Sequence, residues 1–164
     1  MVRIAILASA VALGALAASV ATLAVAGPGE PGHSHATYAA GEPGDPKKPA
    51  RVIPVTMKEM DDGKMAYFPD KVEVRKGEQV KFVLKNSGKT DHEFMLDTVE
   101  RNAKHKVEME KNPDMEHDDP NGKRLAPEKG SEIVWRFSKA GEFEFACLIP
   151  GHYESGMKGT VVVK

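Results

Sequence analysis

The chain of 164 residues contains a single cysteine, Cys147, and almost no net charge, with 23 basic against 24 acidic side chains. One cysteine excludes an internal disulfide and any metal centre built on several thiolates. Without a basic surplus to neutralise phosphates, nucleic acid is not an expected partner. Aromatic residues make up 6% and charged residues 29%, which is typical of a soluble domain and not of a membrane bundle. What remains is one domain of ordinary size whose lone thiol needs an explanation.

The amino terminus holds the one long apolar stretch of the sequence. Residues 4–26 contain ten alanines and no charge, follow the basic Arg3, and end in Ala24-Val25-Ala26. A basic start, an apolar stretch and a small-x-small triplet are typical of a secretory signal peptide. We predict that residues 1–26 are removed after Ala26, that the mature chain has no membrane segment, and that it resides in the periplasm. The alternative is an uncleaved anchor helix, since about 20 apolar residues can span a bilayer.

The next segment, residues 27–50, has five glycines and five prolines in 24 positions. This composition without apolar periodicity predicts a disordered leader with no secondary structure. Its two histidines, His33 and His35, are interpreted as a solvated pair in the leader. The alternative is a weak site that captures metal ions.

Residues 51–164 alternate between short β-type segments and turn signals, at intervals of about ten residues. The expected strands are residues 52–57, 65–68, 71–75, 79–85, 92–96, 131–137, 142–147 and 159–164. Seven or eight short strands with period-two patterning predict an all-β domain, an antiparallel sandwich or barrel. Trp135 alternates with Ile133 and Phe137 and is expected in the core, as is Met57.

One insertion interrupts this pattern between the strands of His92 and Trp135. Residues 97–129 are rich in charge and poor in large apolar side chains. Asp97 and Glu100 resemble a helix capping box, and Pro113 stops any helix. We expect a short exposed helix over about 98–111, followed by an irregular loop to residue 129.

A loop near the carboxyl end carries three metal-binding side chains. Cys147, His152 and Met157 follow one another at intervals of five residues between two expected strands, and Pro150-Gly151 turns the loop. Alternation along residues 142–147 places Cys147 on the inward face, with the glutamates of that strand facing outward.

Far upstream, His92 shares the parity of Phe94 and Leu96, so it should also point inward. Two imidazoles, one thiolate and one thioether are the donor set of a type 1 copper centre. The thiolate donates strongly to Cu(II), the thioether favours Cu(I), and histidine serves both states. Zinc is a weaker alternative because methionine is a poor ligand for it. A further alternative is a buried free thiol with an unrelated histidine and methionine.

Enzymatic activity finds little support in the sequence. It contains no serine-centred elbow, no His-Glu-x-x-His and no phosphate-binding loop. A multicopper oxidase would need several His-x-His clusters, and the sequence has one. A Cys147–His152 dyad is conceivable, but a cysteine on an inward strand face lacks the exposure of a nucleophile. We expect that the protein is not an enzyme.

A family resemblance is carried by Met157 and two stretches, Asp91-His92-Glu93-Phe94 and Phe143-Glu144-Phe145-Ala146-Cys147-Leu148-Ile149-Pro150-Gly151-His152. Over residues 51–164 the chain resembles the cupredoxin family, the plastocyanin- and azurin-type blue copper proteins. It is most similar to secreted bacterial cupredoxins associated with copper tolerance. The resemblance implies an eight-stranded Greek-key sandwich with His92, Cys147 and His152 as equatorial ligands and Met157 as axial ligand. The loop is longer than the Cys-x2-His of plastocyanin, which leaves a blue or a green site open.

Two functional interpretations follow for a monomer that holds one type 1 copper ion. The protein is a copper-tolerance factor that binds or oxidises copper, or a one-electron carrier that docks a redox partner near His152. Its expected protein partner is accordingly a redox protein or a copper-handling protein. Residues that could bind further weak Cu(I) favour copper tolerance: His33, His35, His105, Met109, Met115 and His117. For the last four, the alternative is an exposed helix and loop whose methionine packs on the sandwich.

Overall fold

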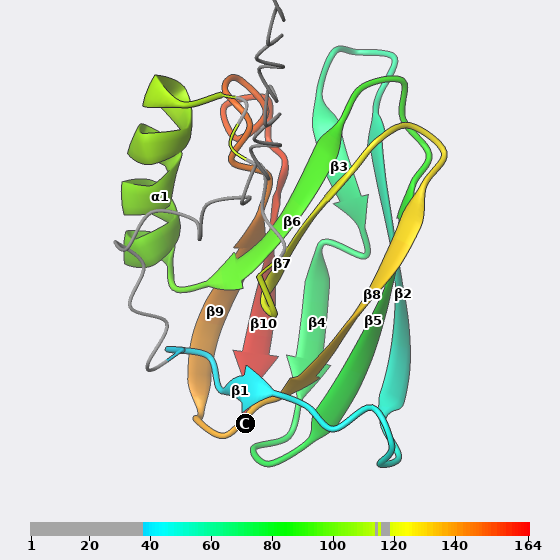
Figure 1. Ribbon diagram of the computed structural model, residues 1–164, viewed down its shortest axis with the longest axis vertical. Coiled ribbons are helices and arrows are strands. Elements are labelled where there is room, and N and C mark those ends of the chain that lie inside the picture. The colour runs from blue at the N-terminus through cyan, green and yellow to red at the C-terminus, as the bar shows by residue number, and fades with distance from the viewer. Residues whose placement is uncertain (1–37, 114, 116–118) are drawn as a thin grey trace, which may run out of the picture. The chain divides into compact units, whose positions relative to one another are not determined.

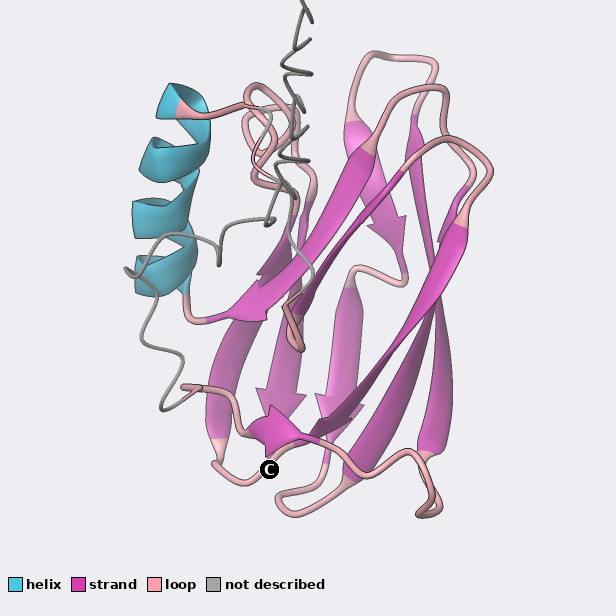
Figure 2. Cartoon of the chain, viewed as in Figure 1, coloured by secondary structure: helices cyan, strands magenta, loops and turns pink. Residues whose placement is uncertain are grey.

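Two five-stranded sheets pack face to face in the computed structural model, which describes residues 38–113, 115 and 119–164 (Figure 1). In chain order the elements are β1 (Glu42–Pro43), β2 (Arg51–Glu59), β3 (Met65–Phe68), β4 (Lys71–Val74), β5 (Gln79–Asn86), β6 (His92–Asp97), α1 (Val99–Lys111), β7 (Gly122–Leu125), β8 (Gly130–Arg136), β9 (Gly141–Ala146) and β10 (Lys158–Val163). Figure 2 shows that strands dominate and that α1 lies outside the sandwich. All eight expected strands are present within one or two residues of the predicted bounds.

The strand order is β1-β8-β5-β2-β3 in one sheet and β4-β10-β9-β6-β7 in the other. Most neighbours are antiparallel, but β2 pairs with β5 and β4 pairs with β10 in parallel. The chain leaves the first sheet after β3, forms β4 in the second sheet, and returns as β5 beside β2. The predicted β-sandwich is therefore confirmed, and its pairing is antiparallel as expected except for these two pairs of strands.

The core lies between the sheets and is rich in aromatic side chains. In β5, Val80, Phe82 and Leu84 are buried while the residues between them are partly exposed. Met57 and Trp135 are fully buried, which confirms both predictions for the core. Each large apolar side chain buried in this way stabilises the fold by about 1.5–3 kcal/mol.

Residues 38–50 belong to the sandwich, which corrects the prediction of a disordered leader over this part of 27–50. β1 pairs with β8, and the ring of Tyr38 packs edge-on against Trp135 with centroids 5.0 Å apart. Gly41 has a φ of +143°, and a Cβ there would come within 2.1 Å of a carbonyl oxygen of β8. Glycine and proline here lie in and beside a close-packed edge strand. Their number alone does not distinguish such a strand from a disordered segment.

Helix α1 confirms the predicted helix but not its cap. The cap is Thr98, whose Oγ1 accepts a hydrogen bond from the Arg101 amide at 3.2 Å, while the Asp97 carboxylate accepts one from the Thr98 amide at 2.8 Å. The helix ends at Lys111, two residues before Pro113. Among the described residues, no helix is long and apolar enough to cross a membrane. The predicted signal peptide, residues 1–26, lies outside the described part of the chain.

Strand β7 corrects the prediction of an irregular loop up to residue 129. It pairs antiparallel with β6, so that Leu125 lies opposite His92. Its first residue, Gly122, leaves space for the Met95 side chain, because a Cβ there would lie 2.4 Å from the methyl carbon of Met95. A four-residue strand with two charged residues at its centre has too little alternation to be detected from sequence.

Candidate metal centre

Three neighbouring strands bring the predicted ligands to one end of their sheet. His92 is the first residue of β6, Cys147 directly follows β9, and Met157 directly precedes β10. β9 pairs antiparallel with both β6 and β10. The start of β6, the end of β9 and the start of β10 therefore meet at the same end of the sheet. His152 lies on the loop that joins β9 to β10.

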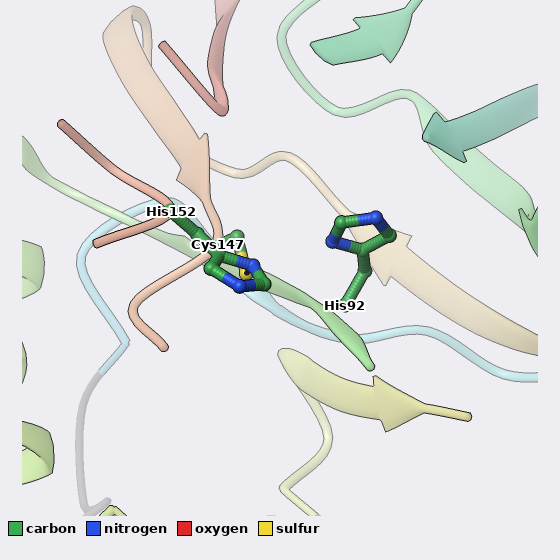
Figure 3. A group of neighbouring side chains, drawn as sticks. All are labelled: His92, Cys147 and His152. Carbon is green, nitrogen blue, oxygen red and sulfur yellow. Dashed lines mark hydrogen bonds between the residues drawn. The ribbon is translucent and has the colours of Figure 1, made fainter. Parts of the chain in front are cut away.

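The structure brings His92, Cys147 and His152 together with donor atoms that all lie within 4.8 Å of one another (Figure 3). Sγ of Cys147 lies 3.3 Å from Nδ1 of His152, and the two imidazole centroids are 5.2 Å apart. His92 and Cys147 are fully buried, whereas His152 is partly exposed. The inward orientation predicted for His92 and Cys147 is thus confirmed.

Met157 is fully buried and fixed to the same loop by its backbone. Its amide donates to the carbonyl of His152 at 3.1 Å, and the Cys147 amide donates to the carbonyl of Met157 at 3.1 Å. Gly151 and Gly156 take positive φ values of +85° and +95°, which allow the tight turns between these bonds. Backbone hydrogen bonds therefore close the loop on itself. They hold its three candidate ligands in place relative to one another.

Burial controls the charge of the candidate ligands. Burial raises the pKa of the Cys147 thiol to about 12, partly offset by the hydrogen bond from the Glu93 amide. Burial also lowers the pKa of His92 and of His152, and each imidazole is thereby kept neutral near pH 7. A metal ion that binds here must displace the thiol proton, and it meets two imidazoles already in the state that ligates.

The ring nitrogens of the buried His92 bear directly on metal binding. Within the described residues, neither ring nitrogen of His92 has a well-aligned hydrogen bond, and Nε2 lies 3.3 Å from Oε1 of Glu59. Nδ1 is thus a buried lone pair or N–H that is left unsatisfied, which is costly in a protein interior. A metal ion bound by Nδ1 removes this cost, so the residues present fit a metal.

Sequence reasoning missed Glu93, which it treated as an ordinary neighbour of His92. The side chain is fully buried, and its carboxylate accepts a hydrogen bond from the Leu148 amide at 3.1 Å. Its backbone amide donates to Sγ of Cys147 at 3.3 Å, and its carbonyl accepts a hydrogen bond from the buried hydroxyl of Tyr67. Strand parity gives no signal for this residue, because α1 and the ligand loop cover the face that alternation assigns to solvent.

Glu144 is a correction of the same kind, since the strand pattern predicted an outward side chain. It is buried under α1, where its carboxylate accepts hydrogen bonds from Nδ2 of Asn102 at 3.1 Å and from the hydroxyl of Tyr153 at 3.0 Å. Because Tyr153 directly follows His152, this carboxylate connects the helix to the ligand loop.

Glu59, at the end of β2, was also not predicted. Its carboxylate accepts hydrogen bonds from Oγ1 of Thr90 at 2.6 Å and from the amides of Lys89 and Thr90, each at 2.9 Å. Burial raises the pKa of Glu59, but these hydrogen bonds outweigh that effect and lower it to about 2. Glu59 is therefore a carboxylate at neutral pH.

The secondary candidates are placed in part. Nδ1 of His105 lies 3.6 Å from Oε2 of Glu108, and Met109 is fully buried in a small cluster against which Met115 packs. The other members of this cluster are Met95, Ala146 and Leu148. The burial of Met109 fits the packing alternative, and a second copper site there stays a prediction. His33, His35 and His117 lie outside the described residues.

Comparison with known proteins gives relatives in sequence and in structure. Residues 55–164 match the family described as copper binding proteins, plastocyanin/azurin family. The chain is 49% identical over 109 residues to the copper-resistant cuproprotein CopI of Rubrivivax gelatinosus, a match that covers 66% of either chain. The protein of that name from Pseudomonas aeruginosa is 37% identical over 131 residues, which cover 62% of this chain and 72% of the relative. Reduced auracyanin from Roseiflexus castenholzii superposes with a TM-score of 0.60 at 22% identity, covering 70% of this chain and 98% of auracyanin.

The two-sheet sandwich with two histidines around a buried thiol defines the class of small β-sandwich copper proteins, or cupredoxins. The chain belongs to the plastocyanin/azurin family of copper-binding proteins. The resemblance seen in the sequence is confirmed, and so is copper as the ion. The donor set agrees, because one thiolate and two imidazoles suit copper in both of its oxidation states.

Proposed function

We propose that the protein holds one copper ion between His92, Cys147 and His152, with Met157 as a weak axial donor, and that it serves copper resistance. The observation that carries this proposal is the convergence of three donor atoms within 4.8 Å at a buried thiol. The bound ion supplies a one-electron Cu(I)/Cu(II) couple. The name copper-resistant cuproprotein of the relatives from Rubrivivax and Pseudomonas supports the physiological role.

The chain itself sets the conditions for that couple. The Glu93 amide points at Sγ of Cys147 and stabilises negative charge on the sulfur. The closed loop from Cys147 to Met157 keeps the donors in place when the charge of the ion changes. A site that rearranges little between two oxidation states exchanges electrons with a low barrier.

The second candidate function is that of a one-electron carrier, which one observation favours. His152 is the candidate ligand that reaches partial exposure, while His92, Cys147 and Met157 are fully buried. Its ring edge is therefore the shortest route for an electron between the ion and a docked redox protein. In either proposed function the protein is a monomer and has no enzymatic activity. Residues 1–26 direct it to the periplasm.

Growth of a copper-sensitive bacterium that expresses the full chain tests the proposed function. Wild type should restore growth at elevated copper, and Cys147→Ser should not. Glu73→Gln is the matched control, because Glu73 pairs with Lys164 at the opposite end of the sandwich and should behave like wild type. Equal protection by wild type and Cys147→Ser would contradict a role of the thiol site in resistance.

A further inference from the structure

A carboxylate from the opposite sheet contacts one of the candidate ligands from behind. Glu59 closes β2 in one sheet, and His92 opens β6 in the other. Oε1 of Glu59 lies 3.3 Å from Nε2 of the fully buried His92. Figure 3 shows one ring nitrogen of His92 on the side of Cys147 and His152 and the other directed away from them. Nε2 of His92 thus faces the carboxylate of Glu59, and Nδ1 faces the other two candidate ligands.

Glu59 is itself held in place by the turn that leads into His92. The amides of Lys89 and Thr90 and the hydroxyl of Thr90 all donate to its carboxylate, at 2.6–2.9 Å. These donors lie two and three residues before His92, so the carboxylate and the imidazole are fixed by the same short segment. An exposed glutamate held only by long-range charge would not be aligned in this way.

Gly88 provides an independent sign that this contact is closely built. A Cβ at position 88 would lie 2.4 Å from Oε2 of Glu59 and 2.7 Å from Nε2 of His92. Both distances are too short for any side chain, so the backbone of the turn packs directly on the carboxylate–imidazole pair. A residue larger than glycine would push the two side chains apart.

We propose that Glu59 is a positioning residue of the copper site: it accepts the Nε2–H of His92, fixes the tautomer that presents Nδ1 to copper, and places a negative charge behind the ring. This inference rests on the proposed function. Metal-bound histidines commonly give their second N–H to such a partner, which orients the ring and strengthens it as a donor. Glu59 is not itself a ligand, because it is outside the group of converging donor atoms found among the described residues.

A negative charge behind His92 stabilises Cu(II) more than Cu(I), because the more highly charged ion gains more from it. Glu59 should therefore lower the reduction potential of the site. Removing the charge should weaken Cu(II) binding by about 10- to 100-fold, the usual effect of losing such a partner. Each tenfold loss that is not shared by Cu(I) corresponds to a rise of about 59 mV for a one-electron couple.

The test compares Glu59→Gln with wild type and with Glu73→Gln as purified copper proteins. Measured are the visible spectrum, the Cu(II) and Cu(I) affinities by competition with chelators, and the reduction potential. We expect a raised potential and weakened Cu(II) binding for Glu59→Gln, and wild-type values for Glu73→Gln, which removes the same charge at the far end of the sandwich. A wild-type potential and wild-type affinities in Glu59→Gln would overturn the inference.

Two further variants separate positioning from a purely structural role. Gly88→Ala keeps every charge but displaces the pair, and it should alter the visible spectrum and weaken Cu(II) binding. Thr90→Val removes one hydrogen bond to Glu59 and keeps its charge, so it should lower thermal stability while shifting the potential far less than Glu59→Gln. The inference would be overturned if the reduction potential changed in proportion to thermal stability across Glu59→Gln, Gly88→Ala and Thr90→Val. A wild-type protein that binds no copper would instead refute the proposed function.

Discussion

The backbone amide of Glu93 donates to Sγ of Cys147 at 3.3 Å. The carboxylate of the same residue accepts a hydrogen bond from the amide of Leu148, the residue that follows Cys147. Glu93 therefore fixes the end of β9 from β6 by two contacts, one on the candidate ligand and one beside it. The side chain is buried because α1 and the ligand loop cover this face of the sheet.

The first prediction concerns that carboxylate. In Glu93→Leu the buried amide of Leu148 loses its acceptor, and we expect the free energy of unfolding to fall by about 1–3 kcal/mol. Glu93→Gln retains an oxygen and should lose less. Chemical denaturation of the metal-free proteins measures both values. A Leu variant as stable as wild type would show that this hydrogen bond does not hold the loop.

The second prediction concerns the axial position. Met157→Leu conserves the apolar volume of a fully buried side chain, so the fold should persist and copper should still bind. The reduction potential should rise, since a donor to the ion is lost. Voltammetry of the purified copper protein measures the shift. A lowered potential would argue against an axial role for Met157.

The third prediction concerns the pH dependence of the metal-free protein. Burial lowers the pKa of His92 and His152 from their ordinary value of 6.5, so below pH 6.5 the unfolded state takes up protons that the folded state refuses. Burial raises the pKa of Cys147 from 9.0 to about 12, so above pH 9 the unfolded state releases a proton that the folded state retains.

Stability of the metal-free protein should therefore be greatest between about pH 6.5 and 9 and decline on both sides. Below pH 4.5 the lowered pKa of Glu59 adds to the acid-side loss. Denaturation midpoints across this range measure the profile. In Cys147→Ser the loss of stability above pH 9 should be smaller. An unchanged loss would contradict its attribution to the raised pKa of Cys147.

The fourth prediction concerns the amino-terminal edge of the domain. A chain that starts at residue 51 lacks β1 and uncovers Trp135, which packs against Tyr38. It should be less stable than a chain that starts at residue 38 by about 1.5–3 kcal/mol, the value for burying one large apolar side chain. Both chains should still bind copper, because the candidate ligands lie between residues 92 and 157. Equal stability of the two chains would contradict a structural role for β1.

The fold could be predicted from the sequence where a strand has one face in the core and one in solvent. β5 is such a strand: its alternation predicted its first residue, its last residue to within one position, and the burial of Val80, Phe82 and Leu84. Alternation failed as a guide where a further layer covers the outer face of the sheet: Glu93 and Glu144 follow an outward parity, yet α1 and the ligand loop bury them. It also failed for β1 and β7, which are held by pairing to a neighbour and not by a pattern of their own.

The candidate site could be predicted because its residue types are rare and its spacing is local. Cys147, His152 and Met157 lie on one loop, and His92 follows from strand parity. The partners that orient them were not predictable in this way, because they depend on contacts between strands that are far apart in the sequence. Glu59 lies 33 residues before His92, and nothing in the periodicity of β2 indicates that its last side chain reaches the imidazole.

Titration of residues 27–164 with Cu(II), followed by visible absorption and metal analysis, tests the copper site at Cys147 directly. We expect an intense thiolate-to-copper band that saturates at one equivalent and is lost in Cys147→Ser. If more than one equivalent of copper binds and this band does not change, the protein has further copper sites outside the thiol centre. No band at all, or an unchanged band in Cys147→Ser, would contradict a copper site at the Cys147 thiolate.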